Sequence, residues 1–498
     1  MYKLFKNMLL IVLLSTFISA CVSSPIATQI PMQSGTPAPT ETLDLDINQP
    51  NVTTTPLPAR PAYSPGELVD YTAQTGDTLP AIAAHFNTTV QEILLANTFI
   101  PASATTMPPG MPMKIPIYYQ PFWGSQYQIL PDSLFINGPA QIGFDTAAFV
   151  TEQPGWLNGY FEYAFNGNRT GAEIVDYVSK NFSVSPRLLL ALLEYQTGAL
   201  TQPLFPEQLR QYPLGYQDWL HKGLYLQLVW AANLLNNGYY GWRIGNLVEF
   251  DHLDGTMERI DPWQNAATVA LQYYFSRLLS GTSFARAIAY DGFALTYRNL
   301  FNDPWQAIAP HIPGSLEQPE FMLPFLPGLT WAYTGGPHTG FGQGAPLAAI
   351  DFAPGALTGG CTLSNEWVTA VAQGVVVRSE PGAVVLDLDG DGDERTGWVV
   401  FYFHIATQDR APAGRTLQVG DPIGHPSCEG GRTTGTHVHI ARKYNGEWIP
   451  ADGVLAFNLG GWVAHNGAVE YLGTLTRGTQ TIKACDCADA TSQIEAGR

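Results

Sequence analysis

Residues 435–440 read Gly-Thr-His-Val-His-Ile, which places His437 and His439 two positions apart. In an extended strand such side chains share a face, so both imidazoles would point one way while Val438 and Ile440 enter a core. Two imidazoles on one side of a strand are well placed to bind one Zn²⁺ together. The stretch therefore predicts a β-strand with a metal site. A His-x-His pair also arises by chance in β-proteins, so the prediction needs support from other segments.

Two other segments give that support. The sequence Phe-Tyr-Phe-His-Ile at 401–405 places His404 on a second strand, where alternation would put it on the same face as Tyr402. His338 follows a pair of glycines, and Asp351 lies thirteen residues later in an apolar stretch. With one histidine of the His-x-His pair, they give Zn²⁺ three protein ligands and leave a fourth position for water.

The C-terminal third of the chain is expected to be an all-β domain. Short strand-like runs alternate with Gly-rich turns, and no helical pattern separates them. We expect the domain at 323–475, followed by a C-terminal tail at 476–498. The predicted strands are 366–372, 374–378, 383–387, 397–405, 416–419 and 436–442.

This set of residues resembles the lysostaphin, LytM-like and beta-lytic type of zinc metalloendopeptidases, which hydrolyse peptides of peptidoglycan. The thirteen-residue spacing from the first ligand to the aspartate is similar to that of the beta-lytic branch. Because the chain has no His-Glu-x-x-His motif, a histidine must take the proton of the attacking water, and the sequence leaves open which one. The resemblance implies one Zn²⁺ per chain, the ligands His338, Asp351 and His439, and the catalytic pair His404 and His437.

The cysteines suit an exported protein. Cys361 lies ten residues after the predicted aspartate ligand, and Cys428 lies nine residues before the first histidine of the His-x-His pair. Both should flank the site, so we favour a disulfide between them. Cys485 and Cys487 are expected to be too close to bridge each other easily, and their partners stay open.

An acidic run begins with Asp387, Asp389 and Asp391, which have the spacing that opens a calcium loop. The twelfth position of such a loop would be Trp398, where a bidentate glutamate is needed. Predicted strands lie on both sides of the run. A hairpin turn rich in acidic residues is therefore favoured, with a Ca²⁺ site as the alternative.

The first residues resemble a bacterial lipoprotein signal. Two lysines precede an apolar run at 8–14, which is shorter than the roughly 20 residues of a membrane span. Small residues then precede Cys21, as in a lipobox. We expect a signal peptide at 1–20, lipidation of Cys21, and an extracytoplasmic protein anchored to a bacterial membrane. A Ser/Thr/Pro-rich linker follows at 21–65, whose composition cannot form a core.

Residues 66–118 are expected to form a small α/β module. A Gly-Asp-Thr-Leu turn at 76–79 offers Thr78 as a helix cap, a second helical pattern follows, and an alternating strand ends near Pro116. Strand, helix, helix and strand in this length resemble a LysM module, which binds N-acetylglucosamine polymers such as peptidoglycan.

Residues 150–310 are expected to be mostly α-helical and of unknown role. Thr170 and Glu173 have capping-box spacing, and a helix from Pro186 is apolar on all sides. Glu194 near the end of that helix resembles the catalytic acid of lysozyme-like enzymes, although those enzymes usually continue with serine and this chain has Tyr195. A structural glutamate at a helix end is the favoured alternative.

The length and charge of the chain exclude some classes of function. The length of 498 residues suits about three domains. The formal charge of −18, with no cluster of lysines and arginines, argues against nucleic acid as a partner. The favoured function is a zinc-dependent endopeptidase that cuts peptidoglycan. The alternatives are a non-catalytic peptidoglycan-binding lipoprotein and a glycan-cleaving enzyme centred on Glu194.

Overall fold

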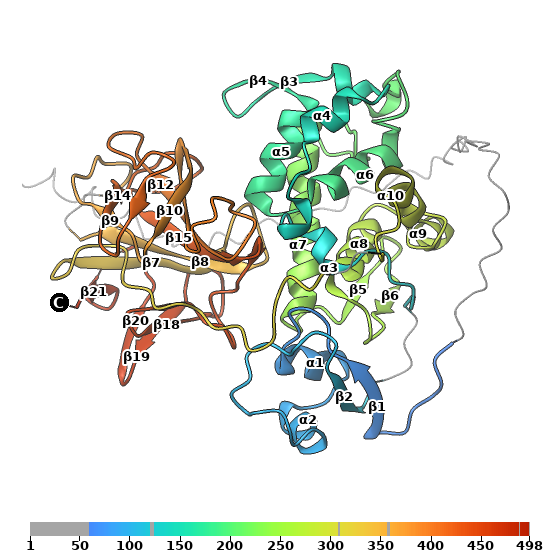
Figure 1. The fold of residues 1–498 in the computed structure, drawn as a ribbon, viewed down its shortest axis with the longest axis horizontal. Helices are drawn as coiled ribbons and strands as arrows, with labels where there is room; N and C mark the ends of the chain where they lie inside the picture. The colour runs from blue at the N-terminus through green and yellow to red at the C-terminus, as the bar shows by residue number, and fades with distance from the viewer. Residues whose placement is uncertain (1–58, 120–123, 307–308, 356–358, 488, 498) are drawn as a thin grey trace, which may run out of the picture. The chain divides into compact units, whose positions relative to one another are not determined.

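The structure is a computed structural model that describes residues 59–119, 124–306, 309–355, 359–487 and 489–497. The predicted signal peptide, Cys21 and most of the predicted linker lie outside the described residues. Within the described part, no helix combines the length and the apolar character needed to cross a membrane. Three regions follow along the chain, and Figure 1 shows them in blue, in teal to yellow-green and in gold to red.

The first region is a two-stranded, two-helix unit. Thr78 caps its first helix by accepting a hydrogen bond from the backbone N–H of Ala81, as the sequence predicted. Thr89 and Glu92 form a capping box at the second helix. Ile82, Phe86 and other apolar side chains form a separate small core. The elements are β1 (Glu67–Thr72), α1 (Leu79–His85), α2 (Val90–Ala96) and β2 (Pro112–Ile117), with β1 antiparallel to β2.

The second region is mostly helical and begins at Asp132, earlier than the predicted start at 150. Thr170 and Glu173 form the expected capping box, and Ser185 caps the apolar helix. That helix is central to the region, because its leucines are fully buried in the largest core. The helices are α3 (Asp132–Phe135), α4 (Thr146–Thr151), α5 (Gly171–Phe182), α6 (Pro186–Thr197), α7 (Leu224–Arg243), α8 (Ala266–Ser276), α9 (Gly281–Ala287) and α10 (Phe293–Phe301). Two short hairpins pair β3 (Phe161–Ala164) with β4 (Gly167–Thr170) and β5 (Glu249–Asp251) with β6 (Met257–Arg259).

The third region is built on an antiparallel sheet in the order β13-β10-β11-β12-β15-β8-β7-β21, with β16 beside β15. No helix is found among its described residues. The strands are β7 (Thr330–Thr339), β8 (Leu347–Pro354), β10 (Gly374–Glu380), β11 (Gly382–Asp387), β12 (Trp398–Ile405), β13 (Thr416–Leu417), β15 (Val438–Tyr444), β16 (Glu447–Trp448) and β21 (Gln493–Glu495). The predicted sheet-rich C-terminal region is therefore found.

The end of the chain differs from the expected tail at 476–498. β21 pairs with β7 at the edge of the main sheet, so these residues complete the domain. A pattern of three strand residues is too short to predict such a long-range pairing. The smaller sheets contain β9 (Val368–Thr369) with β14 (Pro422–Gly424), and β17 (Asn458–Leu459), β18 (Trp462–His465), β19 (Thr474–Arg477) and β20 (Gln480–Lys483) in that order.

The two faces of the main sheet pack against different partners. One face, which includes Ile350, Val400 and Ile440, forms a core within the C-terminal region. The other face, which includes Ala349 and Ala441, belongs to the same core as the helices. Alternation along β8 and β15 places Asp351 and His439 on this second face.

The disulfides agree with one expectation and correct another. Cys361 is bonded to Cys428, the favoured pairing. Cys485 is bonded to Cys487, contrary to the expectation that the two residues are too close to bridge easily. Their Cα atoms are 5.1 Å apart, within the range that a disulfide bridges, because the short segment between them is extended enough.

Candidate metal centre

Strand register brings the predicted ligands together. Asp351 on β8 lies directly opposite His439 on β15, and Gly335 on β7 lies opposite Asp351 from the other side. A side chain at Gly335 would have its Cβ 2.9 Å from a carboxylate oxygen of Asp351, so only glycine fits there. His338 follows three residues later, after an irregularity in the pairing of β7 with β8.

His404 lies beside the same cluster, but its side chain is on the opposite face of β12 from the one that alternation predicts. Alternation along β12 would put it with Tyr402, which is buried in the opposite core. The pairing of β11 with β12 instead shifts between Gly382 and Ala383, and His404 has a φ of +60°. This β-bulge breaks the alternation and turns the imidazole toward the other face, where its ring centroid lies 4.6 Å from that of His437. The expectation of a regular strand through His404 was therefore wrong.

A buried carboxylate lies at the centre of the cluster. Asp351 Oδ1 is 2.9 Å from His338 Nε2 and 3.5 Å from His439 Nδ1, and its Oδ2 is 3.7 Å from His437 Nε2. One ligand atom from each of His338, Asp351 and His439 lies within 4.8 Å of the others. We call these three residues the metal cluster, and each is at least nine-tenths buried.

Burial and mutual charge control the protonation of the metal cluster. Burial alone would raise the pKa of Asp351, but the imidazoles of His338 and His437 hold it well below its usual value. Burial lowers the pKa of His439 well below its usual value, and the nearby His338 adds to the effect. At neutral pH the site therefore offers an anionic carboxylate and a neutral imidazole, which are the forms that bind a metal.

The orientation of His439 also suits a metal. Its Nε2 lies 3.0 Å from the carbonyl oxygen of Gly340, and this nitrogen must carry the proton because a carbonyl can only accept. The proton is therefore absent from Nδ1, which faces Asp351. Metal-binding histidines commonly have such a backbone partner for the outer ring nitrogen. Two imidazoles and one carboxylate are a donor set that Zn²⁺ prefers, so the metal cluster fits this ion.

The other two histidines also donate a ring N–H to a backbone carbonyl, but from Nδ1 instead of Nε2. His404 Nδ1 donates to the carbonyl of Glu429 at 2.9 Å, and His437 Nδ1 donates to the carbonyl of Gly435 at 2.8 Å. Both histidines thus have an Nε2 that can accept a proton. Burial, with a smaller contribution from the neighbouring His437, lowers the pKa of His404 to about 4, so His404 is neutral at pH 7.

The structure adds a residue that the sequence reading missed. The ring of Tyr471 stacks on that of His338, with centroids 4.2 Å apart, and packs beside Gly335. Its backbone N–H donates to the carbonyl of Pro337. Tyr471 is separated from the metal cluster by more than thirty positions in sequence, and no local motif indicates the contact.

The predicted sites outside the cluster have local roles in the structure. The carboxylate of Glu194 accepts hydrogen bonds from the backbone N–H groups of Leu200 and Thr201 and from the Thr201 hydroxyl. Asp387 is the last residue of β11, and Asp389 and Asp391 lie in the turn that leads to β12, with the three carboxylates close enough to hold an ion. Backbone N–H groups of the turn donate to all three carboxylates, which favours the turn over the Ca²⁺ alternative.

Two family models match the chain. The LysM domain matches residues 71–116, and the LasA N-terminal domain matches residues 128–314. The first match agrees with the predicted module. The second covers the helical region, whose role the sequence alone leaves open.

The relatives are peptidases. Protease LasA of Pseudomonas aeruginosa strain UCBPP-PA14 is 24% identical over 347 residues, which cover 65% of this chain and 75% of LasA. The beta-lytic metalloendopeptidase of Lysobacter enzymogenes is 28% identical over 140 residues, 26% of this chain and 73% of that enzyme. Among solved structures, the deep-sea M23 metalloprotease pseudoalterin is 24% identical and covers 34% of this chain and 96% of its own, with a TM-score of 0.29. The relatives confirm the predicted resemblance.

Proposed function

We propose that this chain is a zinc endopeptidase that hydrolyses peptide bonds in peptidoglycan, as its similarity to protease LasA and the beta-lytic metalloendopeptidases supports. The observation that carries the proposal is the metal cluster, in which a buried carboxylate lies between two imidazoles. His439 donates from its outer nitrogen to the carbonyl of Gly340, and the ring of His338 stacks on that of Tyr471. His338, Asp351 and His439 would hold the metal. When bound, Zn²⁺ supplies a Lewis acid that polarises the scissile carbonyl and activates water.

The remaining chemistry is proton transfer by His404 and His437. Their Nδ1 protons are used in hydrogen bonds to carbonyls, so each Nε2 can take the proton of the attacking water and later return it to the leaving amine. His404 is neutral at pH 7 and thus able to accept. The LysM module would hold the enzyme on the glycan and raise the local concentration of its peptides.

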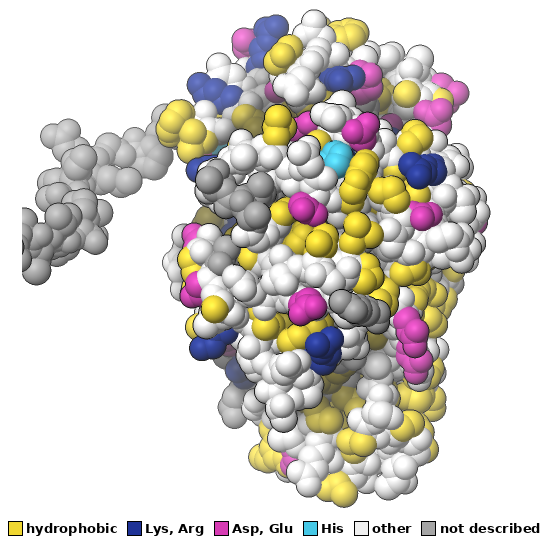
Figure 2. Space-filling view, turned by 90° about the vertical axis from the view of Figure 1, so that its left-hand side faces the viewer, with side chains coloured by type: hydrophobic (Ala, Val, Ile, Leu, Met, Phe, Trp, Pro, Cys, Tyr) yellow, Lys and Arg dark blue, Asp and Glu magenta, His cyan; other side chains and the backbone are white. Residues whose placement is uncertain are grey.

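The surface agrees with a neutral or zwitterionic polymer as substrate better than with a polyanion. The described residues on the face in Figure 2 are mostly uncharged, with isolated acidic and basic side chains and no basic patch. The chain as a whole has a formal charge of −18. Phosphate backbones require clustered cations, so nucleic acid is a poor partner.

The test is a digest of purified peptidoglycan with the purified protein, analysed by mass spectrometry of the soluble fragments. The proposal expects new amino termini and no new reducing ends. Unchanged peptidoglycan would support a non-catalytic binding protein, and new reducing ends would support the glycan-cleaving alternative at Glu194. A His439→Ala variant purified in the same way controls for contaminating hydrolases.

We also propose that the protein is extracytoplasmic and anchored through lipidated Cys21. The residues between Cys21 and the first described strand are rich in Pro, Ser and Thr. Extended at up to ~3 Å per residue, such a tether would place the enzyme roughly 100 Å from the membrane, within reach of the wall. Cys21→Ser should move the protein from the membrane fraction to the soluble fraction with its peptidase activity intact. Retention in the membrane fraction after a high-salt wash would contradict the anchor.

A further inference from the structure

Residues 427–436, which we call the strap, connect β14 to the residue before β15. The strap supplies the carbonyls of Glu429 and Gly435, which accept the Nδ1 protons of His404 and His437. Each carbonyl determines which ring nitrogen carries the proton and where the free Nε2 points. Both histidines of the proposed proton-transfer pair are thus oriented by the same loop.

The metal cluster is held differently. Asp351 and His439 are directly opposite each other on paired strands, and His439 donates to Gly340, which lies outside the strap. His338 is at the end of β7 and stacks on Tyr471. Sheet pairing therefore positions the proposed ligands without the strap.

The strap has little reason to keep one conformation by itself. Its sequence is Ser-Cys-Glu-Gly-Gly-Arg-Thr-Thr-Gly-Thr, and glycines have the most backbone freedom to lose on ordering. Residues 430–432 and Thr434 are exposed, so little apolar burial offsets this loss. Something else must hold the two carbonyls in place.

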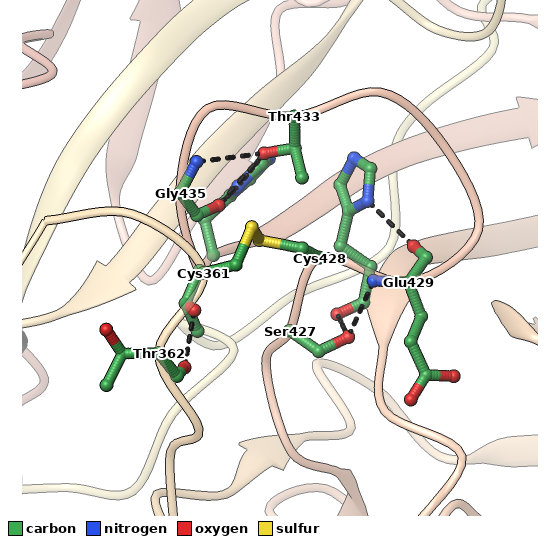
Figure 3. Close-up of a disulfide and its surroundings, with 10 residues drawn as sticks. Cys361, Thr362, Ser427, Cys428, Glu429, Thr433 and Gly435 are labelled. Carbon is green, nitrogen blue, oxygen red and sulfur yellow. Dashed lines mark hydrogen bonds between the residues drawn. A yellow bond between two sulfur atoms is a disulfide. The ribbon is translucent and has the colours of Figure 1, made fainter.

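The segment around Cys361 holds the strap near both of its ends, as Figure 3 shows. Cys361 is bonded to Cys428, the residue before Glu429. At the other end, Thr436 donates its hydroxyl to the carbonyl of Thr362 at 2.5 Å and its N–H to the carbonyl of Gly360. The disulfide joins residues 67 positions apart, so it excludes many conformations that the open chain would have.

We propose that the Cys361–Cys428 disulfide, together with the Thr436–Thr362 hydrogen bond, positions the proton-transfer histidines and takes no part in holding the metal. The inference rests on the proposed peptidase function. Without this disulfide and hydrogen bond, the carbonyl of Glu429 moves away from His404, and the imidazole rotates or changes tautomer. Because errors of about 1 Å in catalytic geometry cost up to ~100-fold, kcat falls while zinc binding and KM persist.

The first experiment compares two disulfide-free variants of the full chain. Cys361→Ser/Cys428→Ser should retain about one zinc per chain and lower kcat about 10- to 100-fold on muramidase-solubilised peptidoglycan, with KM within about twofold. Cys485→Ser/Cys487→Ser is the matched control, because it removes a disulfide of the same domain that has no bond to the strap. The control should have the wild-type kcat.

A spectroscopic measurement separates positioning from general loosening. In protein labelled with ¹⁵N-histidine, His404 and His437 should each give an Nδ1–H tautomer in the wild type and in the control. In the Cys361→Ser/Cys428→Ser variant these two signals should change to a mixture of tautomers. The signal of His439, which has an Nε2–H partner at Gly340, should not change.

A variant pair at Thr436 gives a second test that leaves the disulfide intact. Thr436→Val removes the hydroxyl that binds Thr362, and we expect it to lower kcat about 3- to 10-fold. Thr436→Ser keeps the hydroxyl and should restore kcat. If the double serine variant does not fold, this pair still decides the question.

An unchanged kcat in both the Cys361→Ser/Cys428→Ser and Thr436→Val variants would overturn the proposal, as would loss of zinc along with activity. A wild-type protein without zinc or without peptidase activity would contradict the proposed function instead. The two failures are therefore distinguishable.

Discussion

Two buried clusters among the described residues combine histidine with carboxylates, and they differ in the group that lies between the carboxylates and their neighbours. In the metal cluster, the ion-pair partners of Asp351 among the described residues are all histidines. The second cluster, which we call the arginine cluster, contains a guanidinium at its centre. Its members are Asp132, Arg243, His311 and Glu447.

The arginine cluster joins parts of the chain that are far apart in sequence. Arg243 Nε is 3.2 Å from Glu447 Oε1, and the same guanidinium is 3.2 Å from Asp132 Oδ2. His311 Nε2 is 2.6 Å from Glu447 Oε2. The guanidinium also donates to the carbonyl of Thr75 in the LysM module. Arginine cannot lose its proton or bind a metal, so its charge neutralises the carboxylates permanently.

The difference shows how to distinguish a metal site from a structural ion-pair network. In both clusters a positive neighbour holds the pKa of a buried carboxylate low, to about 2 for Glu447 against the opposing effect of burial. A buried carboxylate with a low pKa is therefore common to both clusters and does not distinguish them. What differs is that imidazoles can give up their charge and leave lone pairs facing a common space, whereas the guanidinium occupies that space itself.

The largest effect should come from removing a ligand. His439→Ala should lose its zinc and reduce peptidase activity to background, because two donors are too few to hold the ion. Metal analysis and a peptidoglycan digest measure both. His311→Gln in the arginine cluster is the matched control and should keep about one zinc per chain. A His439→Ala protein with full zinc content would remove the distinction between the clusters.

Breaking the arginine cluster should affect stability and leave metal binding unchanged. Glu447→Gln leaves the buried charge of Arg243 without its main partner, which costs about 3–5 kcal/mol. The urea midpoint of unfolding should fall, while the zinc content of the folded protein stays at that of the wild type. A variant of wild-type stability would mean that Asp132 alone neutralises Arg243.

The next prediction separates the histidine proposed to transfer protons from the histidine proposed to bind the metal. His437→Ala should keep its zinc and lose activity by at least ~100-fold, since it removes a proton acceptor and no proposed ligand. Zinc content and kcat measured on the same preparation decide the result. If His437→Ala loses zinc and His439→Ala keeps it, the two roles are reversed.

A buried histidine outside both clusters, His85, extends the comparison to the pH dependence of stability. His85 stacks on Trp242 and its Nε2 donates to the Trp242 carbonyl, and burial lowers its pKa to about 3. In the unfolded chain the pKa is near 6.5, so the unfolded state binds the proton first as pH falls. This contribution to stability is complete above pH 6.5 and decreases toward pH 3.

His85→Gln removes the titrating group and keeps a donor for the Trp242 carbonyl. Between pH 6.5 and 5 the wild type should lose up to about 2 kcal/mol more stability than the variant. The measurement is the difference between their denaturant midpoints across this range, which cancels contributions from other groups such as Asp77. Parallel curves would show that the pKa of His85 is the same in the folded and the unfolded protein.

The sequence predicted the site better where the chemistry depends on local spacing. The His-x-His pair and the apolar stretch around Asp351 follow the period of a strand, so their shared face could be predicted. The direction of His404 could not, because the bulge depends on how β12 pairs with β11. The arginine cluster was likewise unpredictable, since Arg243 and Glu447 come together only through the packing of distant elements.

The helical region shows the same limit for folds. The capping box at Thr170 is local and was predicted correctly, whereas the match to the LasA N-terminal domain has no local motif that a single sequence displays. Glu194 is the clearest example. Its position after buried leucines suggested a catalytic acid, but its partners at Leu200 and Thr201 were not visible from the helix alone.

The smallest effect is expected at this glutamate. Glu194→Ala removes the acceptor for two backbone N–H groups and a hydroxyl just after α6, all in partly exposed positions, so we expect a loss of about 1 kcal/mol in the free energy of unfolding. Peptidase activity on solubilised peptidoglycan should equal that of the wild type, and neither protein should generate reducing ends. A carboxylate whose hydrogen bonds are all used for its own loop belongs with the arginine cluster as a structural charge. If the variant instead abolished a reducing-end activity present in the wild type, Glu194 would be a third kind of site, a general acid, and the division of carboxylates into metal ligands and structural charges would fail.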